Sequence, residues 1–391
     1  MRDDPVLDEV VQNALDMVVE EGDLAAARAA GSPFISSGNA IACAVFDPQG
    51  AQLAQTAGGL LHVSALRVML RELLTRIDAA TLAEGDVLIC NDHFLGGIHP
   101  TDVGIFRPVF HAGRLAYFCA AMMIVSDLGG MAAGGLPANA TEIFHEGLVI
   151  PPLRYWTRGQ PEAALRALIR ANSRAPEKVI GDIDALVAGT GVAATRLGEL
   201  LRKYGDARLA EVIGRLLEYG AKRTRAEIAQ LPDGRFSGSY AMEGDGFDEA
   251  RSWIVRCAVT IDGERCRLDF SGTDPQARGP INASYSQALS AAVYALRCYL
   301  DPDIPMNEGF YSAVEVVLPQ GSLVNPDYPA ACNLRMGTVH AMLDAVNQAL
   351  AGEFPERVAA PGSMAATANA SGVKAEGART WTLLDVYLGV G

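Results

Sequence analysis

Four side chains able to bind a metal or move a proton lie close together in one short segment, residues 91–102. They are Asp92, His93, His99 and Asp102. An apolar run over 87–90 precedes the segment, and a run rich in β-branched and aromatic residues over 103–110 follows it, which predicts a strand on either side. The pair Gly96-Gly97 should bend the segment into a tight loop held at both ends by a sheet. Functional sites are often built on loops held in this way.

His99 and Asp102 are candidates for a metal site, because imidazole and carboxylate together suit zinc, manganese or iron. A His-x-x-Asp pair in a loop also forms a hydrogen-bonded turn, and the spacing alone favours the turn. Asp92, directly after a strand, fits a turn or capping carboxylate. His62 and His93 stay open between the same two interpretations. The sequence has no Gly-x-Ser-x-Gly motif and no Cys/His arrangement that predicts a covalent nucleophile.

A second glycine-rich segment follows the apolar run 115–125 and has Asp127 near its start. Its glycines are Gly129, Gly130, Gly134 and Gly135. Small residues let the backbone approach a neighbour closely, as in a phosphate-binding loop. However, no Gly-Lys-Ser/Thr follows, and the spacing is neither that of a P-loop nor G-x-G-x-x-G. We therefore expect a tightly folded structural or site-lining loop, and we assign no nucleotide-binding residue to this chain.

The rest of the sequence alternates between β-rich and helical stretches. Apolar residues at helical spacing predict amphipathic helices after Asp4-Pro5 and from His62 to Leu74. Residues 161–230 are predicted to be helical throughout. The other expected elements are hairpins over 40–55 and 254–270, the second around Asp262-Gly263, then a helix over 287–300, a strand over 314–318 and a helix over 339–350.

These elements predict an α+β fold, a multi-layer mixed α/β protein with β-rich N- and C-terminal parts around a helical middle segment. The expected regions are 1–160, which contains the His/Asp loop, the helical segment 161–232, and a second α/β region over 233–391. The chain stops on the apolar run 386–390, so we expect a domain to be cut short there.

The composition is that of a globular protein with an acidic balance. Its 391 residues include 32 Lys and Arg against 46 Asp and Glu, a formal net charge of −14. This balance argues against nucleic acid or an anionic membrane as a partner. No segment reaches the roughly 20 uninterrupted apolar residues that cross a bilayer, and the acidic N-terminus predicts no signal peptide. The seven cysteines are dispersed without a C-x-x-C, which predicts reduced thiols in a cytoplasmic protein.

Ordered motifs along almost the whole chain resemble the hydantoinase B/5-oxoprolinase family, which also includes the alpha subunit of acetone carboxylase. The matching motifs are Cys43-Ala44-Val45-Phe46-Asp47 with Gly50, His62, Gly85-Asp86-Val87, Asn91-Asp92, Gly96-Gly97-x-His99-x-x-Asp102, Asp127-x-Gly129-Gly130, Leu136-Pro137, Thr141-Glu142-Ile143, Glu146-Gly147-Leu148-x-Ile150-Pro151-Pro152, Asn172-x-Arg174-x-Pro176, Asp269-Phe270-Ser271-Gly272-Thr273, Ile304-Pro305-x-Asn307-x-Gly309, Asn325-Pro326 and Pro355-Glu356-Arg357-Val358.

The resemblance implies an ATP-dependent enzyme built from two kinds of subunit. A hydantoinase A-type partner would bind ATP and phosphorylate an oxygen of a small-molecule substrate. This chain would then hydrolyse the activated cyclic amide, which could be a hydantoin, a lactam or an oxoproline-like ring. The alternatives are a subunit of an ATP-dependent ketone carboxylase of the acetone or acetophenone type, and a non-catalytic paralogue that docks an active partner. ATP is therefore expected on the partner of a hetero-oligomer and not on this chain.

The resemblance also implies roles for the residues of the loop. His99 and Asp102 correspond to ligands of a divalent metal, which could be zinc, manganese or iron. Asp92 or Asp127 would orient groups around the metal or act as a base.

This chain departs from the family pattern at two further positions. The family usually supplies an aspartate before the first strand and a histidine shortly before Asp127. The corresponding residues here are Asn39 or Ala40, and Ile124 or Val125. His62, His93 or Asp127 could substitute for the missing ligands. The family chain normally continues past residue 391, so the region 233–391 is expected to be truncated relative to the family.

Overall fold

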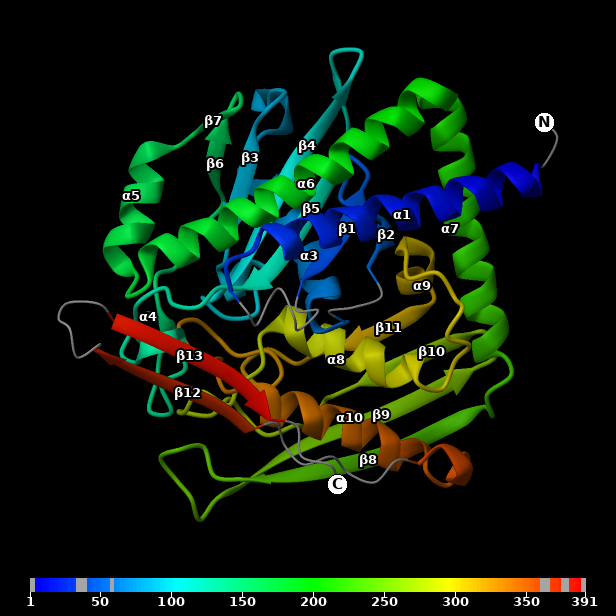
Figure 1. Cartoon of the computed structure of the whole chain (residues 1–391). Helices are drawn as coiled ribbons and strands as arrows, with labels where there is room; N and C mark the ends of the chain where they lie inside the picture. Colours follow the sequence, from blue (N-terminus) through cyan, green and yellow to red (C-terminus); the bar gives the residue numbers. More distant parts are fainter. Residues whose placement is uncertain (1–3, 33–40, 57–59, 359–365, 374–379, 388–391) are drawn as a thin grey trace.

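Seven antiparallel strands form the larger of two main sheets (Figure 1). The structure is a computed structural model that describes residues 4–32, 41–56, 60–358, 366–373 and 380–387. The strands are β1 (Ala42–Phe46), β2 (Gln52–Gln55), β3 (Val87–Cys90), β4 (Asp102–His111), β5 (Arg114–Ile124), β6 (Leu153–Thr157) and β7 (Gln160–Pro161), in the order β2-β1-β5-β4-β3-β6-β7. Because β3 and β4 pair with each other, the prediction that one sheet holds the His/Asp loop at both ends is confirmed.

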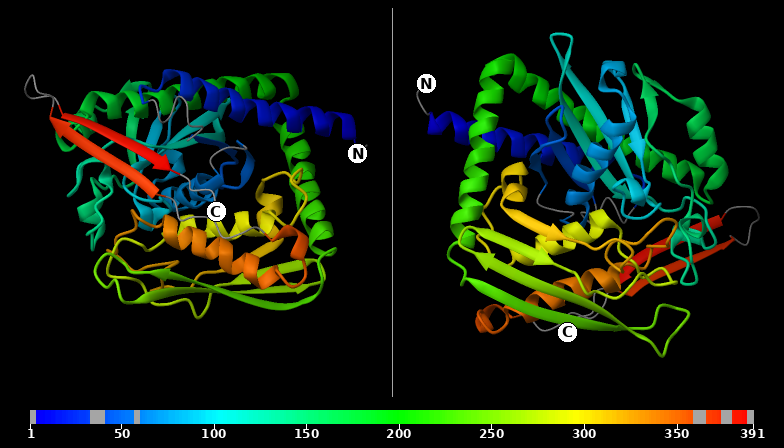
Figure 2. Two further views of the ribbon diagram at one scale, coloured as in Figure 1. Left: turned by 60° about the horizontal axis from the view of Figure 1, so that its bottom comes forward. Right: turned by 180° about the vertical axis from the view of Figure 1, so that it is seen from behind.

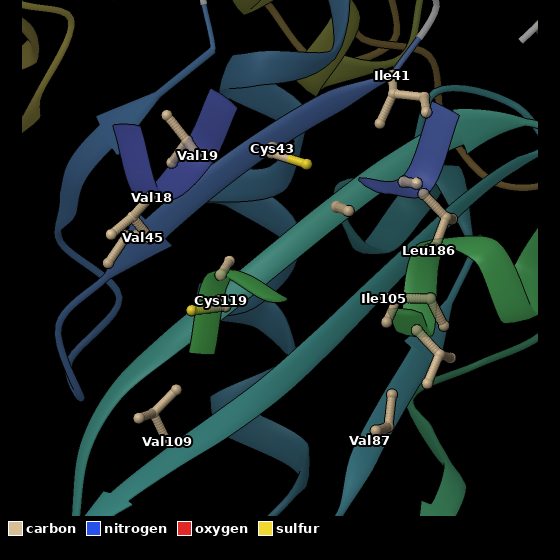
Figure 3. Packing of buried hydrophobic residues seen from close by; sticks show 14 of the residues in the cluster. Val18, Val19, Ile41, Cys43, Val45, Val87, Ile105, Val109, Cys119 and Leu186 are labelled. Atoms are coloured by element: carbon tan, nitrogen blue, oxygen red, sulfur yellow. The ribbon is translucent and has the colours of Figure 1, made fainter. Parts of the chain in front are cut away.

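The central strands of this sheet are buried on both faces, as the alternating side chains of β1 show. Cys43 and Val45 face a core that the sheet shares with α1 (Pro5–Ala29) and α6 (Pro176–Tyr204), and Figure 3 shows part of that core. The intervening residues Ala44 and Phe46 face a second core, which contains side chains of α3 (Leu60–Arg76). Successive side chains of a strand point to opposite faces, so a strand covered on both sides is apolar throughout.

The predicted helical middle segment is confirmed. It consists of α5 (Ala163–Asn172), α6 and α7 (Asp206–Ile228). The long helices α1 and α6 pack together where glycines meet, since a Cβ added at Gly189 would lie 2.5 Å from the carbonyl oxygen of Gly22. From the end of α6, α7 runs along one side of the molecule to the second sheet (Figures 1 and 2).

The second sheet has four strands in the order β11-β10-β9-β8. They are β8 (Gly234–Glu243), β9 (Ser252–Asp262), β10 (Arg265–Asp269) and β11 (Val314–Val317). The hairpin of β9 and β10 turns at Asp262-Gly263 as predicted, with Gly263 at φ 57°. The helices α8 (Tyr285–Arg297) and α10 (Met336–Leu350) share a core with this sheet, and α8 also packs on α3. The contact between α8 and α3 therefore joins the N- and C-terminal parts.

Short elements complete the described chain. They are α4 (Ile143–Glu146), α9 (Glu308–Ser312), η1 (Ala79–Thr81), η2 (His93–Leu95), η3 (Ala133–Gly135), η4 (Pro355–Arg357) and the hairpin of β12 (Ala366–Val373) and β13 (Thr380–Tyr387). All seven cysteines are free thiols. The mixture of helix and sheet confirms the expected α+β class, and the division into three regions stays a prediction.

Candidate functional site

The His/Asp loop takes its shape from one buried amide. Asn91 donates from Nδ2 to the carbonyl oxygens of Pro100 (2.5 Å) and Leu148 (2.9 Å), and its Oδ1 accepts from the backbone N–H of Ile150 (2.6 Å). Gly96 follows η2 at φ 95°, a left-handed conformation that favours glycine. These contacts fix both ends of the loop, so His99 and Asp102 have defined positions.

Asp102 is the centre of a buried polar cluster. It is the first residue of β4 and is fully buried. His62, from α3, places Nε2 2.9 Å from its Oδ1, and His99 places Nε2 3.0 Å from its Oδ2. The third neighbour is Arg335, beside the start of α10, whose Nη2 lies 3.7 Å from Oδ2. Residues far apart in the sequence therefore surround a single carboxylate.

The charges of this cluster follow from burial and from the short distances. Burial by itself would raise the pKa of Asp102, but the nearby His99 and His62 hold that pKa well below its usual range. Burial lowers the pKa of His99, and the Arg335 guanidinium lowers it further. Asp102 is therefore ionised and His99 is neutral at neutral pH. A guanidinium keeps its charge in proteins, so Arg335 balances the carboxylate.

Arg335 is itself held by the C-terminal part of the chain. Its Nη1 donates to the carbonyl oxygen of Asn333 (3.1 Å), and its Nε donates to Oε1 of Gln287 (3.5 Å). Glu146, from α4, accepts at Oε1 from the backbone N–H groups of Cys332 (2.6 Å) and Asn333 (2.8 Å). Burial raises the pKa of Glu146 to about 8. The segment that carries Arg335 is therefore anchored on a second buried carboxyl group.

Several buried polar atoms of this region have no hydrogen-bond partner among the described residues. They are His62 Nδ1, His93 Nδ1, His99 Nε2, Asp102 Oδ2, Glu146 Oε2 and Asn333 Oδ1. The contact of His99 with Asp102 is close but is not aligned as a hydrogen bond. A buried polar group without a partner is costly, so such a cluster is suited to hold a polar ligand or ordered water.

The structure brings three of the predicted site residues together, namely His62, His99 and Asp102. His93 does not contact Asp102 in this cluster. Its Nε2 lies 3.2 Å from the carbonyl oxygen of Ala330 instead. His93 instead lines a pocket of about 320 Å³ beside the loop. The other lining residues of this pocket are Val68, Glu72, Phe94, Gly96, Ser284, Tyr285, Asn325 and Pro326. This volume is at the lower end of the range for small-molecule sites.

The two aspartates predicted to act as a base or to orient groups have backbone partners. Asp92 caps η2 by accepting from the N–H of Phe94 (2.9 Å). Asp127 accepts from the N–H groups of Gly129 (3.0 Å), Gly134 (2.8 Å) and Arg174 (2.8 Å), and it also pairs with the guanidinium of Arg174. These contacts support the expectation of a tightly folded glycine-rich loop. A catalytic role for either aspartate stays a prediction.

The described donor set does not fit a divalent metal. Among residues 4–32, 41–56, 60–358, 366–373 and 380–387, no group of three or more His, Cys, Asp and Glu side chains is arranged to hold a metal ion. Ile124 lies directly opposite Asp102 in the pairing of β4 with β5. Both residues left open as the counterpart of the family histidine, Ile124 and Val125, have hydrocarbon side chains. Asn39 lies outside the described residues. Metal binding by His99 and Asp102 stays a prediction.

Sequence reasoning missed Arg335, Thr101 and the burial of Glu146. Thr101 places its hydroxyl 2.7 Å from Nδ1 of His99, and it was visible as a neighbour of the candidates. Glu146 belongs to one of the motifs shared with the family, but nothing in the sequence predicted that it is buried. Arg335 gave no signal, because nothing in its local sequence separates it from an exposed arginine.

Comparison with known proteins identifies relatives that match most of this chain. The profile of the hydantoinase B/oxoprolinase family matches residues 4–391. The chain is 30% identical over 371 residues to the caprolactamase subunit beta of Pseudomonas jessenii, covering 94% of this chain and 63% of that one. It is 26% identical over 274 residues to the acetophenone carboxylase delta subunit of Aromatoleum aromaticum, covering 69% of this chain and 40% of that one.

A solved structure of one of these relatives has the same fold as this chain. The crystal structure of the ATP-dependent caprolactamase from Pseudomonas jessenii superposes with a TM-score of 0.89 at 28% identity, over 98% of this chain and 66% of that one. The chain thus spans less than two thirds of the length of the curated relatives cited here. Within the described part of the chain, none of the helices combines the length and apolarity needed to cross a membrane.

Proposed function

The chain belongs to the hydantoinase B/oxoprolinase family, and we propose that it is the B-type subunit of an ATP-dependent two-subunit enzyme that hydrolyses a cyclic amide. The substrate would be a hydantoin, a lactam or an oxoproline-like ring, which a hydantoinase A-type partner activates with the ATP that it binds. The observation that carries this proposal is the buried cluster of Asp102, His62, His99 and Arg335, on a fold shared with an ATP-dependent caprolactamase.

The residues of the cluster would supply the polar groups that hydrolysis needs. Neutral His99 would accept a proton from the attacking water, and Asp102, 3.0 Å away, would stabilise the positive charge that the imidazole gains. Thr101 would hold the imidazole through Nδ1. Arg335 would offer positive charge to the phosphoryl oxygens that the activated substrate carries. The pocket beside His93 would receive the ring of the substrate.

Carboxylation of an activated ketone is the alternative reaction. The sequence match to the acetophenone carboxylase delta subunit supports it. The same cluster would then place positive charge next to an enolate oxygen, the kind of charge that a guanidinium stabilises. A non-catalytic paralogue that docks an active partner remains the third possibility for this chain.

One experiment tests these proposals together. The chain is co-expressed with a hydantoinase A-type subunit, and ADP release and product are measured with lactams, hydantoins, 5-oxoproline, and ketones plus bicarbonate. We expect turnover of a cyclic amide, and a loss of about 10²–10⁴-fold in product formation in His99→Ala and Asp102→Asn. The matched control is His111→Ala. It removes a histidine from the same strand, but at the opposite end from Asp102. His111→Ala should keep full activity.

The outcomes separate the alternatives. Turnover of ketones with bicarbonate and not of cyclic amides would favour the carboxylase. A stable complex that none of these substrates stimulates would favour the non-catalytic paralogue. Full activity of Asp102→Asn would refute the assignment of the site.

A further inference from the structure

The neighbours of Asp102 include one permanent positive charge. Arg335 is only 7% exposed, and its Nη2 lies 3.7 Å from Oδ2 of Asp102. This distance is close enough to neutralise the carboxylate and too long for a direct hydrogen bond. The two imidazoles add no second fixed charge, since a histidine is charged only when protonated. The cluster is therefore a carboxylate–guanidinium pair flanked by two histidines.

Arg335 also lies near the other buried carboxyl group of this region. Glu146 anchors the backbone at Cys332 and Asn333, and the carbonyl oxygen of Asn333 in turn accepts from Arg335. Gln287 holds the Nε edge of the guanidinium. Buried charges are retained in proteins only when they are paired and hydrogen-bonded. Gln287 and the backbone that Glu146 anchors thus hold Arg335 in place as an internal cation.

Three features of the cluster oppose a divalent metal. Nε2 of His62 is already hydrogen-bonded to Asp102. The residue across the strand from Asp102 is Ile124, which offers no ligand atom. A metal between His99 and Asp102 would also lie beside the fixed charge of Arg335, and like charges at such distances repel strongly in a buried site.

We propose that Arg335 is the resident cation of this site, and that its guanidinium takes the place of a divalent metal at Asp102. In this chain Arg335 neutralises the carboxylate, orients it towards His62 and His99, and offers positive charge to a ligand oxygen. The cluster therefore works without a tightly bound metal ion. This inference rests on the contacts of Asp102 and holds whichever reaction the enzyme catalyses.

Metal content tests the proposal directly. The complex with its hydantoinase A-type partner is incubated separately with Zn²⁺, Mn²⁺ and Fe²⁺, gel-filtered and analysed by inductively coupled plasma mass spectrometry. The proteins compared are the wild type, His99→Ala with Asp102→Ala, Ile124→His, Arg335→Met, and Arg335→Met with Ile124→His. A further variant combines Arg335→Met and Ile124→His with His99→Ala and Asp102→Ala. Methionine fills much of the volume of arginine without its charge.

We expect the wild type and Ile124→His to retain no stoichiometric metal at the cluster. Removal of the fixed charge in Arg335→Met with Ile124→His should tighten Zn²⁺ binding at least about tenfold relative to Ile124→His alone. That gain should disappear when His99 and Asp102 are replaced. Circular dichroism and gel filtration check that each variant is folded.

A wild-type protein that holds about one metal per chain, lost in His99→Ala with Asp102→Ala, would overturn the proposal. So would equal Zn²⁺ affinity of folded Ile124→His proteins with and without Arg335. If the Arg335→Met variants fail to fold, the wild type and Ile124→His still decide, because both keep the guanidinium. Metal content is measured without turnover, so its result is independent of whether cyclic amides are substrates.

Discussion

Glu146→Gln should make the stability of the protein less dependent on pH. Glu146 is fully buried, and burial raises the pKa of its carboxyl group from 4.5 to about 8. Its Oε1 accepts hydrogen bonds from the backbone N–H groups of Cys332 and Asn333. Glutamine has nearly the same shape and keeps an acceptor oxygen for both N–H groups, but it cannot ionise. The substitution therefore removes the charge and leaves the contacts.

The sign and size of the effect follow from the two pKa values. A pKa that is higher in the folded state means that the folded protein favours the protonated carboxyl group. The contribution of Glu146 is then complete below pH 4.5 and is lost as the pH rises through 8. Over that interval the free energy of unfolding should fall by about 1.4 kcal/mol per pH unit, about 5 kcal/mol in total. This total is an upper limit, because relaxation of the fold around the charged carboxylate would reduce it.

Urea unfolding between pH 5 and pH 8.5 measures this dependence. The wild type and Glu146→Gln should be equally stable near pH 5, and Glu146→Gln should become the more stable protein as the pH rises. The matched control is Glu142→Gln, which replaces a partly exposed carboxyl group four residues away in the same turn. Parallel stability curves for the wild type and Glu146→Gln would refute the reasoning, because Glu146 would then be ionised in the folded protein.

Two further substitutions test how the loops near the site are built. In Gly96→Ala the new Cβ would lie 2.4 Å from the backbone nitrogen of Met69, whereas at Gly113, also at positive φ, nothing lies within 4 Å. Thermal unfolding should therefore show a cost of about 1–2 kcal/mol for Gly113→Ala and a clearly larger one for Gly96→Ala, and equal losses would contradict the close packing. Asp127→Ala removes the acceptor of three backbone N–H groups and one carboxylate partner of Arg174, so urea unfolding should show a loss of about 3–5 kcal/mol, mainly from the three N–H groups. A loss below about 1 kcal/mol, as for an exposed pair, would mean that this aspartate does not organise the loop.

The local parts of the site could be predicted from the sequence because short-range geometry fixes them. Apolar runs of strand length on both sides of the loop predicted β3 and β4, and both are present. The spacing of His99 and Asp102 was consistent with two interpretations, a hydrogen-bonded turn and a pair of metal ligands. The backbone N–H of Asp102 does donate to the carbonyl oxygen of His99 at 2.9 Å, so the turn is formed.

The sequence left Ile124 and Val125 open as the position at which the family usually has a histidine, and it did not show which of them lies beside Asp102. In the pairing of β4 with β5, Ile124 is the one opposite Asp102. Val125 points into the core shared with the helices. A shift of one residue in register exchanges the two faces of a strand, and the apolar run 115–125 carries no alternation that would fix its register.

Arg335 could not be predicted because its role comes from tertiary contacts alone. It lies beside the start of α10, in a segment whose local pattern is the same for a buried and an exposed arginine. Only the packing of that segment against Glu146 and Gln287 brings the guanidinium to Asp102. Long-range polar contacts of this kind leave no periodic signal in a sequence.

The site therefore depends on the joining of the two β-rich parts. The loop that carries His99 and Asp102 belongs to the first sheet, yet the hydroxyl groups of Ser284 and Ser286, at the start of α8, donate to the carbonyl oxygen of Gly97 at 3.0 and 2.6 Å. The C-terminal part thus fixes the backbone of the loop as well as supplying the guanidinium that balances its carboxylate. Asp102 without Arg335 would be a buried charge flanked only by two imidazoles, which is an unfavourable state. The contact between the two parts consequently fixes the backbone of the loop and places the guanidinium beside Asp102, and the chemistry that we propose depends on both.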